Sequence, residues 1–157
     1  MSKSEFVIRE ATVEDIHFIT EHAYRLVEFG PPPWRDQTGM TKTDIEVITT
    51  SIANKDNGKV VYIAIDESGQ RHGFIHLTTA IDYFTRHAHG HISDLVVVKE
   101  AEGKGVGKLL LTTAEEWAKS NGFKWITLSV FEKNTKAKGV YERAGFQPDT
   151  IKYVKEL

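Results

Sequence analysis

Hydrophobic residues repeat along the chain with two different periods, and polar, glycine or proline clusters separate the repeats. Spacing of three and four residues places side chains on one face of a helix, and it predicts helices at about 12–29, 41–53, 106–120 and 134–145. Alternation and short β-branched runs predict strands at about 5–9, 59–65, 72–80, 89–98, 125–131 and 150–155. No repeat or shift in composition divides the chain, so we expect one domain over residues 1–157.

Capping and breaker residues set the helix ends. Thr12 followed by Asp15 is typical of an N-cap with a reciprocal acid, and the glycine and prolines at 30–33 end that first helix. Thr41 or Thr43 is the expected N-cap of the second helix. In the fourth helix, the spacing predicts a buried stripe that consists of Ala137, Val140, Tyr141 and Ala144.

The order of these elements predicts an α/β fold with a mixed, twisted sheet. A turn at 66–69 joins the strands 59–65 and 72–80 into an antiparallel hairpin. From residue 89 onward the chain alternates strand, helix, strand, helix and strand, which is typical of helices packed on a sheet with parallel pairing. A crossover through the helix at 106–120 is then right-handed.

Composition and charge exclude several classes of protein. The chain has no cysteine, which excludes a disulfide framework, a thiol nucleophile and a thiolate metal site. The net charge of −2 argues against bulk affinity for nucleic acid or an anionic membrane. No apolar run approaches the roughly 20 residues that span a bilayer, and the N-terminus lacks the apolar core of a signal peptide. We therefore expect a cytoplasmic protein with neither a nucleic-acid nor a membrane partner.

The clearest chemistry lies in the glycine-rich loop between the strand at 89–98 and the helix at 106–120. Gly103, Gly105 and Gly107 allow backbone N–H groups to converge without a Cβ in the way. The helix that follows at once leaves its first N–H groups unpaired and adds the positive end of its dipole. This arrangement is typical of a phosphate-binding site, and a turn that binds nothing is the alternative.

Two common phosphate-binding motifs do not match this loop. Counting back from Gly107 and Lys108, a Walker loop would need a glycine where Glu102 stands and a hydroxyl where Leu109 stands. The dinucleotide fingerprint G-x-G-x-x-G reaches Lys108 or Leu110 at the position of its last glycine. A nucleotide-binding enzyme is therefore kept only as an alternative interpretation.

Two segments, in this order, resemble the GNAT acetyltransferase superfamily. In the first, a strand with Leu95 and Val97 precedes the loop E-G-K-G-V-G at 102–107, which is similar to the family pattern (Q/R)-x-x-G-x-(G/A). The second, N-T-K-A-K-G-V-Y-E-R-A-G-F at 134–146, is similar to N-x-x-A-x-x-x-Y-x-x-x-G-F. The match covers about the last third to half of the chain. It implies a GNAT-like fold, in which a central mixed sheet is splayed at the cofactor site and has helices on both faces.

The resemblance implies acetyl-CoA as the cosubstrate, with its pyrophosphate on the loop amides and its pantetheine arm beside the preceding strand. The implied cofactor-binding residues are Leu95, Val96, Val97, Glu102, Gly103, Lys104, Gly105, Val106, Gly107, Lys108, Asn134, Ala137 and Tyr141. Glu102 departs from the family pattern, which has Gln or Arg there. A carboxylate near pyrophosphate is unfavourable by about 1 kcal/mol in a solvated setting, and Lys99, Lys104 and Lys108 can offset it.

Acetyl transfer to an amine requires a base, donors for the developing oxyanion and an acid for the departing thiolate. The resemblance assigns the acid to Tyr141, although helical spacing alone would place that side chain in the core. Asn134 is a helix N-cap by its local chemistry and a contact of the cofactor arm by resemblance. Both roles are compatible.

The base has four candidates. Asp94, His91 and His89 lie on the strand where the family often carries an acidic base, and His76 lies on the partner strand. Strict alternation would place the two histidines on one face and Asp94 on the other, whereas a bulge near Ser93 would break that rule. We predict Asp94.

The acceptor side would be built from Trp34 and Asp36 in the proline-rich stretch, from Tyr83 and Phe84, and from His76. A linker in which Trp34 caps the edge of the core is an equal alternative for the first of these. His87, His89 and His91 stand at alternate positions of a strand, so they share a face and could bind a metal ion together. No carboxylate or cysteine stands at a spacing that would complete such a site. We expect no metal.

These features predict an acetyl-CoA-dependent N-acetyltransferase that acts on a primary amine of a small molecule or peptide by direct attack. A non-catalytic module that binds or senses acyl-CoA is the alternative. The resemblance also implies a homodimer, which is usual in the family. The sequence does not name the acceptor.

Overall fold

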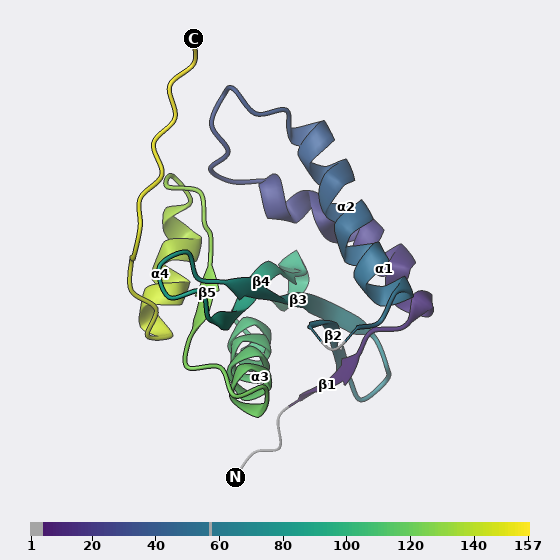
Figure 1. The fold of residues 1–157 in the computed structure, drawn as a ribbon. Helices are drawn as coiled ribbons and strands as arrows, with labels where there is room; N and C mark the ends of the chain where they lie inside the picture. Colours follow the sequence, from purple (N-terminus) through teal and green to yellow (C-terminus); the bar gives the residue numbers. More distant parts are fainter. Residues whose placement is uncertain (1–4, 57) are drawn as a thin grey trace.

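One five-stranded sheet organises the computed structural model, which describes residues 5–56 and 58–157 (Figure 1). Its strands are β1 (Phe6–Glu10), β2 (Lys59–Asp66), β3 (Arg71–Ile81), β4 (Ala88–Val97) and β5 (Ile126–Leu128). They lie in sequence order across the sheet. The pairs from β1 to β4 are antiparallel, whereas β4 and β5 are parallel. The predicted mixed sheet and its hairpin are confirmed.

Helices cover both faces of this sheet (Figure 1). The helical segments of the described residues are η1 (Val13–Asp15), α1 (Ile16–His22), η2 (Ala23–Val27), α2 (Gln37–Ala53), η3 (Lys99–Ala101), α3 (Val106–Ser120) and α4 (Thr135–Arg143). On the face of α1 and α2, a buried cluster includes Ile19, Ile48, Ile63 and Phe74. On the face of α3, a second cluster includes Ile75, Leu77, Val106 and Leu110, and Val140 and Tyr141 of α4 pack against it. Residues 74–77 of β3 therefore alternate between two cores.

A buried carboxylate joins the first turn of the helical segment to the sheet. Asp15 is fully buried and accepts hydrogen bonds from Arg9 of β1 at 2.7 and 2.8 Å and from Arg71 of β3 at 2.6 Å. It also accepts from the Thr12 N–H at 2.8 Å, which confirms the reciprocal acid of the predicted cap. Burial alone would raise the pKa of Asp15, but these hydrogen bonds hold it below its ordinary value.

Helix α2 begins earlier than predicted. Its N-cap is Asp36, whose carboxylate accepts from the Thr38 N–H at 3.2 Å and the Gly39 N–H at 3.1 Å. The prediction of Thr41 or Thr43 was wrong because apolar spacing starts only at Ile45, whereas the cap chemistry stands nine residues before it.

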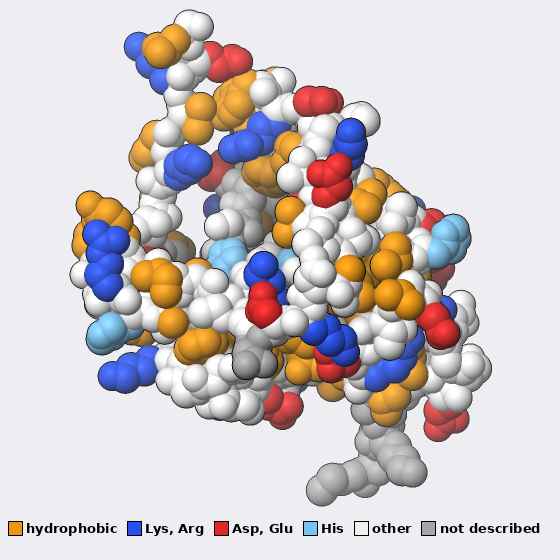
Figure 2. Space-filling model, turned by 45° about the vertical axis from the view of Figure 1, so that its right-hand side comes forward, with side chains coloured by type: hydrophobic (Ala, Val, Ile, Leu, Met, Phe, Trp, Pro, Cys, Tyr) orange, Lys and Arg blue, Asp and Glu red, His pale blue; other side chains and the backbone are white. Residues whose placement is uncertain are grey.

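The end of the chain differs most from the prediction. Strand β5 is shorter than the predicted 125–131, and no strand forms at 150–155; among the described residues, 147–157 make no backbone hydrogen bond to the rest of the chain. A strand requires a partner edge, and none reaches this segment. Ile151 and Tyr153 are 71% and 88% exposed on an extended chain that stands clear of the body (Figure 2). Ala144 is also exposed, so the predicted stripe of α4 was wrong at that position.

Candidate active site

A bulge in β4 decides which side chains face the α2 side of the sheet. His76 pairs with Asp94 and Leu77 pairs with Ile92, so Ser93 is the extra residue. Its hydroxyl lies 2.8 Å from Thr78 Oγ1. Because the extra residue resets the alternation, Asp94 faces the α2 side of the sheet, while Ile92 belongs to the core cluster under α3. The bulge that the sequence analysis considered near Ser93 is confirmed.

Beyond this bulge β4 separates from β5. Their pairing runs from Gly90 with Ile126 to Ile92 with Leu128 and then stops, although β4 stays paired with β3 as far as Val97. The β5-facing backbone of residues 93–97 is therefore unpaired with any strand in the described chain. This is the splay that the resemblance implied. It leads along Leu95, Val96 and Val97 directly to the glycine loop.

The glycine loop has the geometry of an anion-binding turn. Gly103 and Gly105 have φ of +77° and +88°, which side chains rarely adopt, and Gly105 is the N-cap of α3. The Leu109 N–H donates to the Gly105 carbonyl at 3.0 Å, so the N–H groups of Val106, Gly107 and Lys108 have no acceptor within the helix. These groups point to the N-terminal end of a 15-residue helix, where a phosphate is favoured.

The unusual Glu102 is paired with two cations. Arg25 of η2 donates to Glu102 Oε1, and Lys136 of α4 donates to Oε2 at 3.0 Å. These two hydrogen bonds, that of Lys136 foremost, lower the pKa of Glu102. Arg25 also donates through Nε to the Val97 carbonyl at 2.9 Å. The negative charge at this family position is therefore compensated by residues far from it in the sequence.

The second motif begins α4, as predicted. Asn134 caps the helix and accepts from the Ala137 N–H at 3.2 Å. Gly30, which ends the first helical region, comes so close that a Cβ there would lie 2.8 Å from the Asn134 nitrogen. Tyr141 is half-buried beside Phe146, with ring centroids 6.0 Å apart, and burial raises its pKa. A tyrosine with a raised pKa keeps its proton at neutral pH.

Two predicted residues meet in the interior. His76 Nδ1 lies 2.8 Å from Asp94 Oδ2, and His76 Nε2 lies 2.8 Å from the hydroxyl of Ser51 in α2. All three residues are buried. Asp44 lies two turns before Ser51 on α2. Burial, and then the charge of Asp94, raise the pKa of Asp44 to about 6. The carboxylate of Asp44 has no hydrogen-bond or ion-pair partner within residues 5–56 and 58–157.

The other two candidate bases share a partner on β5. His89 Nε2 and His91 Nδ1 lie 3.1 and 2.8 Å from Thr127 Oγ1. Burial lowers the pKa of His91. His89 Nδ1 is buried without a hydrogen-bond partner in the described chain. The described residues also contain no group of three His, Cys, Asp or Glu side chains placed to hold a metal ion.

Of the remaining predicted substrate residues, Tyr83 and Phe84 lie apart from Asp94 along the β3–β4 hairpin. Tyr83 and Phe84 are 72% and 81% exposed at the tip of the β3–β4 hairpin, and the six residue steps of β4 from Ala88 to Asp94 span about 20 Å. Trp34 is 44% exposed in the loop before α2. The Asp36 carboxylate caps that helix. Their substrate roles stay predictions.

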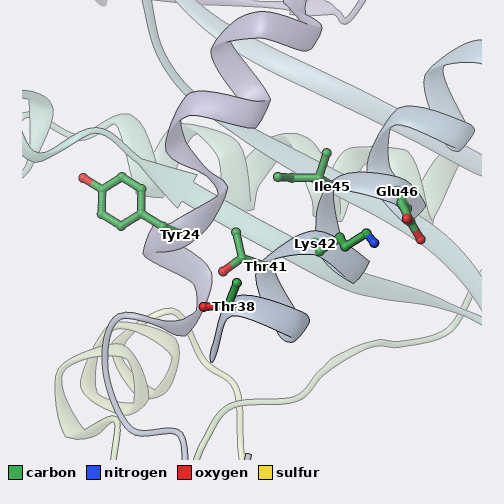
Figure 3. Close-up of a pocket in the computed structure, with 6 residues that line it drawn as sticks. All are labelled: Tyr24, Thr38, Thr41, Lys42, Ile45 and Glu46. Carbon is green, nitrogen blue, oxygen red and sulfur yellow. The ribbon is translucent and has the colours of Figure 1, made fainter. Parts of the chain in front are cut away.

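A surface pocket of about 610 Å³ lies between η2 and the first turns of α2 (Figure 3). Its lining consists of Tyr24, Thr38, Thr41, Lys42, Ile45 and Glu46. Thr41, Asp44, Ile48 and Ser51 recur at helical spacing on α2, and they are half-buried or buried. One stripe of α2 therefore runs from this pocket to the partner of His76.

The sequence model of a protein family, described as the acetyltransferase (GNAT) family, matches residues 20–146. This chain belongs to the GNAT family. The match includes the glycine loop, the bulged strand and the second motif. No helix in the described part of this GNAT chain is long and apolar enough to cross a membrane.

Two curated proteins of Bacillus subtilis (strain 168) are similar to this GNAT chain. "Uncharacterized N-acetyltransferase YhfO" is 34% identical over 98 residues, which are 62% of this chain and 66% of YhfO. "Uncharacterized N-acetyltransferase YobR" is 38% identical over 60 residues, which are 38% of this chain and 24% of YobR. The match thus spans just under two thirds of the first relative and a much smaller part of the second.

Solved structures share the GNAT fold over nearly the whole chain. A putative acetyl transferase from Pyrococcus furiosus superposes with a TM-score of 0.74 at 26% identity and covers 98% of this chain and 100% of that one. AAC(6')-Iy, in complex with the bisubstrate analog CoA-S-monomethyl-acetylneamine, superposes with a TM-score of 0.71 at 19% identity, again over 98% and 100%. The second likeness shows the fold alone.

Sequence reasoning missed three residues that interact with the predicted site residues of this GNAT chain: Arg25, Asp44 and Ser51. Ser51 and Asp44 stand on the inner stripe of α2, and their helical spacing from Ile48 was the available signal. Nothing local pointed to Arg25, because its partners Val97 and Glu102 are 72 and 77 positions away.

Proposed function

We propose that this GNAT protein transfers an acetyl group from acetyl-CoA directly to a primary amine of a small molecule or peptide. The observation that carries the proposal is the open edge of β4 at residues 93–97, which runs from the bulge to the glycine loop. An extended pantetheine arm can pair with such an edge by main-chain hydrogen bonds, and the loop N–H groups can donate hydrogen bonds to the pyrophosphate oxygens. The cofactor-binding residues of this proposal are those predicted from the two motifs.

In the proposed reaction, Asp94 takes a proton from the acceptor ammonium, and the neutral amine attacks the thioester carbonyl. Free N–H groups of β4 stabilise the oxyanion. When the tetrahedral intermediate collapses, the carbon–sulfur bond breaks and Tyr141 gives its proton to the departing thiolate. The nitrogen, positively charged since its attack, then loses its surplus proton to the Tyr141 phenolate, which restores the phenol, and Asp94 returns its own proton to solvent. The raised pKa of Tyr141 supports an acid that is protonated before this step. No covalent intermediate on the protein is required.

A cationic acceptor suits the charges around the site. Burial, and then the charge of Asp94, raise the pKa of Asp44, and an ammonium group bound near both carboxylates would favour their ionised forms. We place the enzyme in the cytoplasm.

A homodimer is the remaining part of the proposal. The C-terminal chain carries exposed Ile151, Tyr153 and Leu157 and has no strand partner within the described residues. A second copy would cover these side chains. Light scattering of the full chain and of Tyr153→Ser tests this, since the variant should shift the protein towards monomer.

Two measurements test the proposed function. Acetyl-CoA and coenzyme A should raise the melting temperature more than ATP or NAD does, since ATP or NAD would be preferred by a nucleotide-binding enzyme. Mass spectrometry should find acetylated product in a mixture of diamines, polyamines, aminoglycosides and amino acids. Stabilisation by acetyl-CoA without any acetylated product would favour the non-catalytic acyl-CoA module instead.

A further inference from the structure

A series of hydrogen bonds runs from Asp94 on β4 through His76 on β3 to Ser51 on α2. The two nitrogens of His76 each lie 2.8 Å from an oxygen, one of Asp94 and one of Ser51. The imidazole is fully buried, and Ser51 and Asp94 are 7% and 9% exposed. Burying a polar group without a hydrogen-bond partner costs free energy, so these hydrogen bonds offset the cost of burying the three side chains.

The carboxylate is the end that opens towards the site. Every polar side-chain atom of the three residues has a partner in the described chain except Asp94 Oδ1. The opposite end is closed, because Ser51 is buried in the last turn of α2 and its hydroxyl is also 3.2 Å from the Val47 carbonyl. A serine in that position cannot receive a substrate, so the series does not act as a hydrolytic triad, in which the serine is the exposed end.

The distances also favour one tautomer of His76. The Ser51 hydroxyl can donate its proton either to His76 Nε2 at 2.8 Å or to the Val47 carbonyl at 3.2 Å. When it donates to Nε2, the imidazole is neutral and its proton stands on Nδ1, facing the carboxylate. When it donates to Val47, Nε2 must carry a proton. His76 is then either a fully buried cation or presents a bare Nδ1 to Asp94, and both are unfavourable.

We propose that His76 and Ser51 are positioning residues for the base of the acetyl transfer. Ser51 holds His76 as the Nδ1–H tautomer, and His76 holds Asp94 Oδ2, so that Oδ1 is aimed at the incoming amine. The inference rests on the proposed function and adds to it two residues that act only through Asp94. It also explains the bulge at Ser93, without which Asp94 would face the other core.

The chain offers matched controls for both positions. His72, on the same strand, forms a second His–Asp pair, with Nε2 2.8 Å from Asp66 Oδ2. Ser120 bonds the carbonyl four residues before it in α3, at 2.8 Å, as Ser51 does in α2. Neither control residue belongs to the proposed site. His72→Leu and Ser120→Ala therefore report the general cost of losing such contacts.

The kinetic test compares His76→Leu, His76→Asn and Ser51→Ala with these controls. We expect His76→Leu to lower kcat about 100-fold, as misplacement of a catalytic group does, with the KM for acetyl-CoA unchanged. His76→Asn, whose amide nitrogen can replace Nδ1–H, should restore most of kcat, and Ser51→Ala should lose about tenfold. Equal losses in His76→Leu, His76→Asn and His72→Leu would overturn the proposal.

The pH profile separates positioning from packing. Loss of the Nδ1–H donor removes a hydrogen bond to the charged form of Asp94, so the acid limb of kcat/KM should move to higher pH in His76→Leu and stay in place in His76→Asn. The other titratable groups facing this site are Asp44 on α2 and His89 and His91 on β4. They are the same in all variants. An acid limb that does not move would contradict the proposal.

A spectroscopic test of the His76 tautomer does not depend on catalytic turnover, and it is made on the wild-type protein. Long-range ¹H–¹⁵N NMR of the wild-type protein at pH 7.5 should show His76 in the neutral Nδ1–H form. The signals of His76 are assigned by their loss in His76→Asn, and His72→Leu removes those of the other imidazole that is paired with a carboxylate. A neutral Nε2–H form at His76 would overturn the tautomer. If no amine is acetylated but the Nδ1–H form is found, the proposed function fails while the tautomer stands.

Discussion

Glu102 of the glycine loop is held by Arg25 of η2, which stands 77 positions earlier in the chain. The same guanidinium donates to the carbonyl of Val97, the last residue of β4. One side chain thus joins the N-terminal half to both the splayed strand and the loop. It also explains how an acidic residue stands where the family has Gln or Arg, because Arg25 and Lys136 compensate its charge.

Glu102→Gln should strengthen the binding of acetyl-CoA. The substitution removes a negative charge beside the pyrophosphate, and it frees the charge of Arg25 and Lys136 for the ligand, while the amide oxygen still accepts from Arg25. A gain of about 1 kcal/mol corresponds to a KM for acetyl-CoA roughly fivefold lower. Glu100→Gln, at an exposed position of η3, is the control. A higher KM in Glu102→Gln would show that the carboxylate organises the loop.

Gly30→Ala should unfold more easily than a comparable glycine variant elsewhere. Gly30 has φ of +88°, and its Cβ would meet the backbone nitrogen of Asn134 at 2.8 Å. Strain and clash together should cost about 2–3 kcal/mol in urea unfolding. Gly69 has φ of +84° but open space around it, so Gly69→Ala should cost only about 1 kcal/mol. Equal costs at the two positions would mean that the loop moves away from α4 freely.

Asp15→Asn should destabilise the protein in a pH-dependent way. The carboxylate is fully buried between Arg9 and Arg71, and its loss should cost about 2–3 kcal/mol at pH 7. Because the folded pKa lies below the ordinary 3.8, the stabilisation is complete above that value and is lost as the pH falls below it. Urea unfolding at pH 7 and pH 3 should therefore show the gap between wild type and Asp15→Asn narrowing. A constant gap would contradict this account of the pKa.

Asp44→Asn should have the opposite pH dependence. An acid whose folded pKa is about 6, above the ordinary 3.8, binds its proton more tightly when folded, so wild-type stability falls as the pH rises from about 4 to 6. The variant lacks this loss, so its free energy of unfolding at pH 7 should exceed that of the wild type. The difference should be at most about 1 kcal/mol, because Asp44 is partly exposed and solvent screens its charge. The same variant should bind a diamine acceptor more weakly. Increased stability without weaker amine binding would remove Asp44 from the acceptor site.

The sequence predicted the parts of the site whose chemistry is local. The glycines at 103 and 105 adopt the positive φ that their positions require, and Asn134 caps α4 three residues before Ala137. Both motifs act through short-range backbone geometry, which a local pattern records.

The parts that escaped prediction depend on contacts between distant segments. A bulge at Ser93 places Asp94 beside His76, yet a bulge leaves no reliable mark in the alternation of a single strand. Ser51 joins them only because α2 crosses the sheet at that point. The predicted strand at 150–155 has a strand-like sequence and no partner in the described chain, which sequence period cannot reveal.

The central claim is acetyl transfer to an amine with Tyr141 as the acid, and release of free coenzyme A tests it most directly. Thiol release from acetyl-CoA should be measured with diamines, polyamines, aminoglycosides and amino acids, for wild type and for Tyr141→Phe. We predict release that depends on an amine and falls by about 100-fold in Tyr141→Phe, with the KM for acetyl-CoA little changed. Amine-dependent release that is equal in both proteins would contradict the role of Tyr141. No release with any amine would contradict the proposed function.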